Sequence, residues 1–257
     1  MELQLLEYKK QNCKIINTFN IMKTVLIIFV FLFSTHSFSQ EITGKQLLEK
    51  AIQYHDPNGK WETFKGTLLV TMETLASPKR ESEIQIDLPN QFFSVKAKSG
   101  ENTSEYSIDK DSIQIVFNGD KNPSEEILKK NRLSKDRAKM YQNYYTYLYG
   151  LPMKLKDEGT IIHSKIEHKT FKGKPYLVLK ATYKKEVGKD IWYFYFNPKT
   201  YAMEVYQFFH DESKNDGEYI LLTQEETING VKMPKNRAWF TNKEEKHLGT
   251  DILNSNK

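Results

Sequence analysis

The segment FKGTLLVTME, residues 64–73, decides the fold class of this chain. Apolar or small residues occupy every second position from Phe64 to Met72, and polar residues occupy most of the positions between them. Successive side chains of a strand point to opposite faces of a sheet, so this alternation predicts a strand with one buried face and one wet face.

The same alternation recurs along most of the sequence that follows. Turn-forming pairs such as Ser77-Pro78 and Asn118-Gly119 separate the candidate strands, and Asn229-Gly230 is typical of a two-residue hairpin. The candidate strands cover residues 64–73, 83–88, 93–95, 106–108, 113–117, 160–167, 176–183, 190–196, 202–210, 218–223, 236–241 and 247–253. We expect them to form one antiparallel meander of about ten strands.

Helical signals precede and interrupt the strands. Thr43 and Gln46 fit a capping box that opens a helix ending before Pro57. A second helix is expected from Ser134, its N-cap, to Tyr149, with Gly150 in the left-handed position after it.

Two strands are apolar on both faces, IWYFYF at 191–196 and MEVYQFF at 203–209. Such strands must be covered on both sides, and the Tyr-rich helix 135–149 is the expected cover for the side that faces away from the sheet's interior. The expected fold is α+β: a strongly curved antiparallel β-sheet, an unclosed half-barrel, with an N-terminal helix and a helical insert covering the concave face.

The segment MKTVLIIFVFLFSTHSFSQ, residues 22–40, predicts export. Its apolar run from Val25 to Phe33 is too short to span a bilayer and precedes small residues at a signal-peptidase site, so 22–39 is interpreted as a signal peptide. Residues 1–21 are then a mis-assigned upstream start, and 40–257 form a single domain. No Cys stands at the junction, so we expect a periplasmic or secreted protein that is not a lipoprotein and has no transmembrane span once mature.

Composition and charge argue against a nucleic-acid partner. The formal net charge is only +5 at pH 7, while the chain contains 15 Tyr and 15 Phe, residues that favour strands and apolar pockets. One basic run stands out, with Lys129, Lys130, Arg132, Lys135, Arg137 and Lys139. It is either a contact for an anionic head group or acidic protein partner, or a plain solvated surface.

Catalytic motifs are missing from the sequence. It has no Gly-x-Ser-x-Gly elbow, no His-Glu-x-x-His and no phosphate-binding Gly-rich loop, so we expect no enzyme activity, no cofactor and no metal. Two dipeptides, His55-Asp56 and His210-Asp211, leave open the alternative of a cell-envelope hydrolase with a His-Asp site.

Several phrases carry a family resemblance: AIQYHDPNGKW at 51–61, YLYGLPMKLKDEGT at 147–160 and FNPKTYAMEVYQF at 196–208. With them the chain resembles a family of uncharacterised exported bacterial proteins defined by a domain of unknown function. The order of helix, strands, helical insert and strands is more distantly similar to the periplasmic lipoprotein carriers and receptors of the LolA/LolB type. That resemblance implies an open curved sheet whose concave side holds acyl chains under helices.

The resulting hypothesis is a non-catalytic periplasmic carrier for a lipid or another hydrophobic molecule, including lipoprotein acyl chains. A ligand-free structural protein of the envelope is the other alternative. The predicted cavity lining from the sheet is Leu68, Val70, Met72, Ile84, Ile86, Ile113, Ile115, Trp192, Tyr193, Tyr195, Met203 and Val205. The predicted lining from the helical lid is Tyr141, Tyr144, Tyr145 and Leu148.

Overall fold

The computed structural model describes Met1, Lys10 and residues 41–254. The predicted upstream segment 1–21 therefore lies outside the described residues except for Met1 and Lys10, and the predicted signal peptide 22–39 lies outside them entirely. Among the described helices, none combines the length and the apolar composition that a membrane crossing requires.

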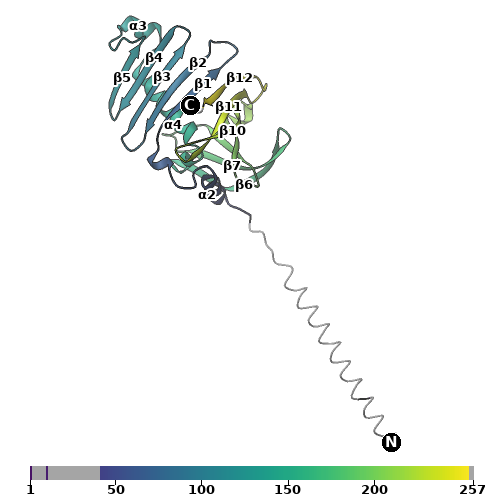
Figure 1. The fold of residues 1–257 in the computed structure, drawn as a ribbon. Coiled ribbons are helices and arrows are strands. Elements are labelled where there is room, and N and C mark those ends of the chain that lie inside the picture. Colours follow the sequence, from purple (N-terminus) through teal and green to yellow (C-terminus); the bar gives the residue numbers. More distant parts are fainter. Residues whose placement is uncertain (2–9, 11–40, 255–257) are drawn as a thin grey trace. The chain divides into compact units, whose positions relative to one another are not determined.

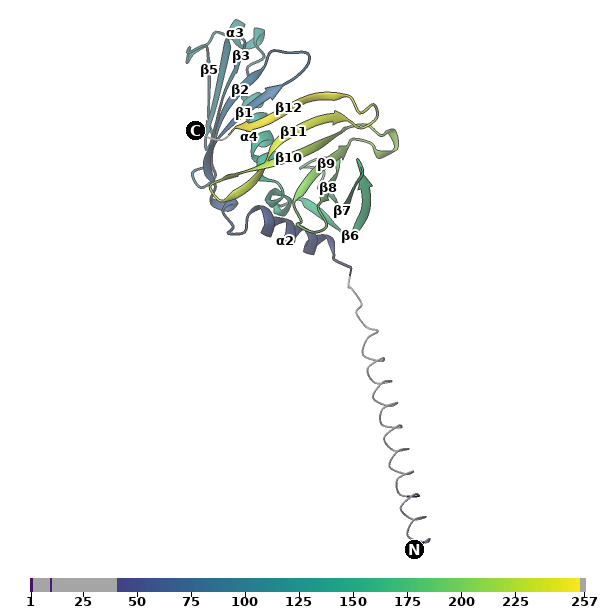
Figure 2. The same ribbon diagram turned by 45° about the vertical axis from the view of Figure 1, so that its right-hand side comes forward.

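One antiparallel sheet of twelve strands dominates the unit that begins at Ile42 (Figures 1 and 2). From one edge to the other, the strands follow the order β5-β4-β3-β2-β1-β12-β11-β10-β9-β8-β7-β6. The first meander comprises β1 (Lys65–Glu73), β2 (Arg80–Asp87), β3 (Phe92–Ser99), β4 (Asn102–Asp109) and β5 (Ser112–Phe117). The second comprises β6 (Thr160–Phe171), β7 (Lys174–Tyr183), β8 (Ile191–Phe196), β9 (Met203–Phe209), β10 (Glu218–Ile228), β11 (Val231–Thr241) and β12 (His247–Asn254).

The first and last strands join these two meanders. β1 pairs with β12, with Leu69 opposite Asn254 and Glu73 opposite Thr250. This pairing leaves β5 and β6 as the two outer edges of the sheet, although they follow one another in the sequence. The chain between them must therefore cross the whole sheet, and the helical insert is this crossing segment.

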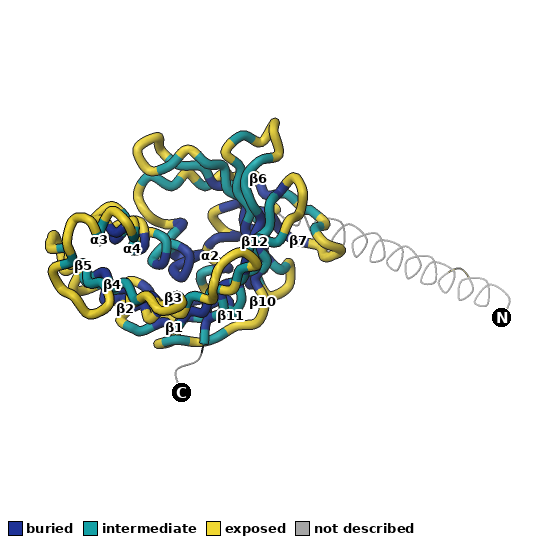
Figure 3. Tube along the Cα trace, turned by 90° about the horizontal axis from the view of Figure 1, so that it is seen from above, coloured by how far each residue is buried: buried dark blue, intermediate teal, exposed yellow. Residues whose placement is uncertain are grey.

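The helical insert contains α3 (Glu125–Lys130), α4 (Lys135–Gly150) and the short helix η2 (Met153–Lys156). The hydroxyl oxygen of Ser134 accepts a hydrogen bond from the backbone N–H of Arg137 at 3.1 Å, which confirms the predicted N-cap of α4. Figure 3 shows α4 inside the curve of the sheet, where the buried segments gather. Its buried residues are Ala138, Tyr141, Tyr145, Leu148, Tyr149 and Gly150.

The N-terminal helix α2 (Gly44–His55) begins with the predicted capping box. Thr43 accepts from the N–H of Gln46 at 3.3 Å, and the side chain of Gln46 accepts from the N–H of Thr43 at 2.9 Å. Together with η1 (Trp61–Thr63), α2 adds Leu47, Ala51 and Trp61 to the main core. The expected α+β class, with an N-terminal helix and an insert on the concave face of an unclosed sheet, is therefore confirmed.

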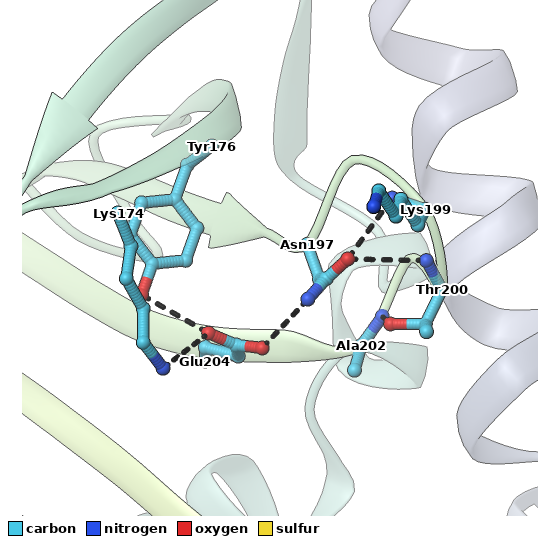
Figure 4. A network of polar contacts seen from close by, with 7 residues as sticks. All are labelled: Lys174, Tyr176, Asn197, Lys199, Thr200, Ala202 and Glu204. Carbon is cyan, nitrogen blue, oxygen red and sulfur yellow. Dashed lines mark hydrogen bonds and ion pairs between the residues drawn. The ribbon is translucent and has the colours of Figure 1, made fainter.

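The expected cover of the doubly apolar strands was wrong. Helix α4 packs on the concave face, and the convex face of β7 to β9 instead forms a second apolar cluster of Tyr176, Val178, Tyr193, Tyr195 and Val205. The polar ends of these side chains are bonded at the surface: the Tyr176 hydroxyl donates to Glu204 at 3.0 Å, and Asn197 donates to the same carboxylate (Figure 4). The amphipathic side chains of this face cover it themselves, so no second layer is needed.

The number of strands also exceeds the expected ten or so. β10 and β11 continue as far as the Asn229-Gly230 turn, where the two residues have φ values of 50° and 88°, which confirms the predicted hairpin. On β10 the residues from Thr223 to Thr227 are mostly polar and exposed, whereas Val231 and Met233 on the opposite strand of the hairpin are buried in the main core. Apolar alternation alone therefore underestimated the length of the strands.

Candidate functional site

The largest pocket described, of about 610 Å³, lies along one side of α4, between this helix and strands β7 to β9 and β11. It is bordered by the segment around η2 and by the loop from β7 to β8. The lining residues are Asn143, Tyr144, Thr146, Tyr147, Leu148, Lys154, Asp157, Glu158, Thr160, Tyr183, Val187, Gly188, Asp190, Trp192, Phe208 and Trp239. A volume of this size is typical of sites for small molecules.

Aromatic rings form the wall of this pocket. The rings of Trp192 and Phe208 stack with centroids 4.9 Å apart, and Tyr147 meets Trp192 edge to face at 5.8 Å. Tyr144 stacks on Trp239 at 6.1 Å. These rings give the pocket a continuous apolar surface that a hydrophobic guest could cover.

Strand register and helix spacing bring these rings together. Trp192 on β8 lies opposite Phe208 on β9, and Phe208 lies opposite Glu218 on β10, so the three side chains share the concave face. Tyr144, Tyr147 and Leu148 have the i, i+3, i+4 spacing that puts them on one side of α4.

Charged side chains at the mouth of the pocket are paired. Lys154 forms an ion pair with Asp157, and Nδ1 of His210 lies 2.7 Å from a carboxylate oxygen of Asp190. The hydrogen bond to Asp190 raises the pKa of His210. The lining therefore carries both signs of charge, with Lys154 against the three carboxylates of Asp157, Glu158 and Asp190.

Two smaller pockets adjoin the largest one. A pocket of about 320 Å³ shares Asn143, Thr146 and Lys154 with it and lies toward β3 and η1. A pocket of about 230 Å³ shares Tyr144 and Trp239 with it and is otherwise lined by Met72, Glu218, Leu248, Gly249, Thr250 and Asp251. Open space therefore lies on both sides of α4, while the helix itself stays anchored to the sheet.

Polar contacts anchor α4 to the sheet. The Tyr144 hydroxyl donates to Asp251 at 2.9 Å, and the buried Arg237 donates to the carbonyl oxygen of Leu148 at 3.4 Å and to that of Pro234 at 3.0 Å. The Arg237 guanidinium also lies 3.8 Å from the ring centroid of Tyr149. Burial raises the pKa of Tyr144 well above its ordinary value, so its hydroxyl stays protonated and remains a donor.

The structure brings only part of the predicted lining together around open space. Tyr144, Leu148 and Trp192 line the largest pocket, and Met72 lines the 230 Å³ pocket together with Tyr144. The space under α4 over the first meander is filled by the protein's own side chains. Buried there or elsewhere in the main core are Leu68, Val70, Ile84, Ile86, Tyr141, Tyr145 and Met203, and packed against them are Ile113 and Ile115.

Three of the predicted residues face away from both pockets. Tyr193, Tyr195 and Val205 belong to the convex cluster, because neighbours on a strand alternate between faces. The sequence could not decide which face of these strands is concave, since both faces are apolar.

Several lining residues were not predicted. Tyr147 and Phe208 could have been found from their spacing, since they lie three and sixteen positions from the predicted Tyr144 and Trp192 on the same faces. Asp190 and Glu218 stand at the starts of β8 and β10, and Asp251 lies within β12. None of them carries a local signal, because each reaches the pockets only through the pairing of distant strands.

The two His-Asp dipeptides do not form a shared site. The ring of His55 is buried, with Nδ1 2.9 Å from the carbonyl oxygen of Lys232 and Nε2 accepting from the N–H of Met203. Asp56 accepts from the N–H groups of Lys60 and Trp61 at 2.6 and 2.8 Å. Asp211 accepts from the N–H of Ser213 and pairs with Lys214. Across residues 41–254, no three His, Cys, Asp or Glu side chains cluster so that they could hold a metal ion.

The basic run from Lys129 to Lys139 spans α3, the turn and the first part of α4. Most of its side chains are exposed, while Arg137 lies 5.7 Å from the ring centroid of Tyr141. None of these residues lines the three pockets described above. An anionic partner for this surface stays a prediction.

The chain was compared with known families, curated proteins and solved structures. The sequence matches the family described as "Family of unknown function (DUF6503)" over residues 22–256. The search of curated proteins finds no match. Among solved structures, the chain is similar to a LolA superfamily protein from Nitrosomonas europaea, with 10% identity and a TM-score of 0.45 over 83% of this chain and 92% of that one.

Two further solved structures are similar to a comparable degree. One is described as an outer membrane lipoprotein-sorting protein domain from Vibrio parahaemolyticus, with 8% identity and a TM-score of 0.46 over 82% of this chain and 92% of that one. The other is a DUF1329 family protein from Desulfovibrio piger, with 6% identity and a TM-score of 0.46 over 83% of this chain and 92% of that one.

Proposed function

The chain belongs to the DUF6503 family, and we propose that this member is a non-catalytic carrier that binds a lipid or another hydrophobic molecule between α4 and the concave face of its sheet. The observation that carries the proposal is the pocket of about 610 Å³ with a wall of stacked aromatic rings. We further propose that the protein acts after export, in the periplasm or outside the cell, as its N-terminal segment predicts.

Burial of apolar surface would supply the affinity. Each CH₂ group that moves from water into an apolar pocket contributes about 0.8 kcal/mol. A guest with a dozen such groups could therefore bind without any covalent step. The positions of His55 and Asp56 support a carrier over a hydrolase, because both side chains already have their hydrogen-bonding atoms engaged within the fold.

Replacing the ring of Trp192 tests the pocket directly. Trp192→Ala removes part of the aromatic wall, so we expect the affinity for a neutral apolar dye, N-phenyl-1-naphthylamine, to fall by about tenfold, as about 1.4 kcal/mol of lost contact corresponds to. The measurement is the dye's fluorescence in a titration with the purified exported protein.

Tyr193→Ala is the matched control for this substitution. Tyr193 is the next residue of the same strand, is also aromatic, and belongs to the convex cluster. We expect its replacement to leave dye affinity within about twofold of the unchanged protein. Equal losses in both variants, or no dye binding in any of them, would contradict the proposed site.

A further inference from the structure

The 230 Å³ pocket next to the largest one combines negative charge with aromatic faces. Its charged lining residues are Asp251 and Glu218, and no Lys, Arg or His among residues 41–254 lines it. Tyr144 and Trp239 form the wall that it shares with the largest pocket. A guest that extends from one pocket into the other would thus reach two carboxylates beside two π faces.

Asp251 is a buried acid whose hydrogen bonds come from neutral groups. Its side chain is 3% exposed, and its Oδ2 accepts from the Tyr144 hydroxyl at 2.9 Å and from Nε1 of Trp239 at 3.3 Å. Arg80 lies opposite Met72 on β2, the next strand but one from Asp251, and interacts with Asp251 electrostatically but forms no ion pair with it. A buried carboxylate that is bonded only to neutral donors gains from a positive charge in direct contact with it.

Arg237 does not occupy this position. It lies directly opposite Asp251 in the pairing of β11 with β12, yet its guanidinium donates to the carbonyl oxygens of Pro234 and Leu148. The same group stacks over the ring of Tyr149. Its charge therefore serves to hold the end of α4, and it is not among the residues that line the 230 Å³ pocket.

Glu218 adds a second carboxylate on the same concave surface. It lies opposite Phe208 in the strand pairing, and Phe208 belongs to the wall of the largest pocket. Burial raises the pKa of Glu218, while the neighbouring His210 lowers it. The carboxylate is thus poorly hydrated, and a cation placed beside it would replace part of the lost hydration.

The cations at the mouth of the largest pocket do not cancel this charge. Lys154 is paired with Asp157, and His210 is bonded to Asp190. Glu158 adds another exposed carboxylate to the lining. The net charge of the side chains that line the two pockets is therefore negative.

We propose that the guest is a hydrophobic cation, an amphiphile or apolar amine with a positively charged nitrogen. Its charged group rests against the rings of Tyr144 and Trp239 and faces Asp251 and Glu218, while its apolar part extends into the largest pocket. Aromatic faces attract such a group through their quadrupole, and carboxylates supply its counter-charge. This inference rests on the proposed carrier function and narrows it to one class of guest.

Three probes with the same dodecyl chain test the charge preference: dodecyltrimethylammonium, dodecyl maltoside and dodecyl sulfate. We expect the cationic probe to bind about tenfold more tightly than the neutral one, and the anionic probe to bind most weakly. The measurement is isothermal titration calorimetry below the micellar concentration of each probe. Equal affinities, or tighter binding of dodecyl sulfate, would overturn the cationic guest and leave the carrier proposal standing. Failure of all three to bind would overturn both.

Two substitutions locate the charge that selects the probe. Asp251→Asn keeps an acceptor for Tyr144 and Trp239, and Glu218→Gln keeps the shape of its side chain. We expect each substitution to lower the affinity for the cationic probe about tenfold and to leave the affinity for dodecyl maltoside within about twofold of the unchanged protein. Glu212→Gln is the matched control, since this carboxylate bonds Lys180 and Tyr193 on the convex side. If Asp251→Asn does not fold, the affinities of Glu218→Gln for the three probes test the proposal alone. An unchanged preference for the cation in the Glu218 variant would then overturn the assignment.

Discussion

The ring of His55 joins three elements of the fold. It stands at the end of α2, its Nδ1 donates to the carbonyl oxygen of Lys232 on β11, and its Nε2 accepts from the N–H of Met203 on β9. The bond at Nε2 requires the neutral ring, because a protonated Nε2 cannot accept, and burial lowers the pKa of His55. The folded protein therefore resists protonation at this residue more than the unfolded chain does.

This difference predicts a pH dependence of stability. Below the ordinary pKa of histidine, about 6.5, the unfolded chain takes up a proton that the folded His55 does not, so the free energy of unfolding falls as the pH decreases. One such group contributes a slope of at most about 1.4 kcal/mol per pH unit. His55→Gln keeps a donor and an acceptor but cannot titrate. We therefore expect the free energy of unfolding, measured with urea between pH 5 and 8, to change less steeply with pH in this variant.

His168→Gln is the control for this measurement, because His168 is exposed on β6. Its slope is expected to match that of the unchanged protein. A slope in His55→Gln as steep as in the control would contradict the structural role assigned to the buried ring.

The role of His55 could not be read from the sequence. The dipeptide His55-Asp56 suggested catalysis because the two residues are adjacent, but the bonding partners of His55 lie 177 and 148 positions away. The same limit applies to Asp251, which meets Tyr144 across 107 positions. Local patterns predict which side chains face inward, while the contacts of a buried polar group depend on the pairing of distant strands.

At the scale of single elements, the end of α4 differs from its expected form. Gly150 is the last residue of the helix rather than a left-handed residue after it. A Cβ atom at this position would lie 2.3 Å from Cζ2 of Trp61. Close packing against an indole ring therefore explains the glycine.

Gly150→Ala is predicted to destabilise the fold even though alanine favours helices. The propensity gain of about 1 kcal/mol is outweighed by the clash with the ring of Trp61, and overpacking of this kind costs about 1–3 kcal/mol. We expect a net loss in the free energy of unfolding, measured by urea denaturation. Gly188→Ala is the matched control, since its Cβ would meet nothing closer than 3.8 Å and should change stability by less than about 0.5 kcal/mol. A Gly150 variant as stable as the Gly188 variant would contradict the packing reason.

The strands differ in how well alternation predicted them. β1 to β4 bury one face, so their period of two is visible in the sequence and each was predicted to be a strand. The predicted ranges 93–95 and 106–108 cover only part of β3 and β4, which span Phe92–Ser99 and Asn102–Asp109. β8 and β9 bury both faces, so the same reasoning could not tell the concave Trp192 from the convex Tyr193. The polar end of β10 carries no apolar signal, while the start of β11, with Val231 and Met233 buried, was missed although its apolar residues alternate.

At the scale of the whole sheet, one feature of topology produces the site. Pairing of β1 with β12 separates β5 and β6 to opposite edges, so the segment that connects them crosses the concave face as α4. A single helix cannot fill the curve of twelve strands, and the pockets of about 610, 320 and 230 Å³ lie beside it. The sequence predicted the helix and the curved sheet, but the position of open space depends on which side chains α4 fails to reach.

Native mass spectrometry of the exported protein, before and after organic extraction, tests the central claim that this space holds an apolar guest. We expect a copurifying mass that extraction removes, and that is reduced in Trp192→Ala but retained in Tyr193→Ala. A mass equal to the polypeptide alone in every sample, together with no uptake of apolar dye, would contradict this claim and leave a structural protein without a ligand.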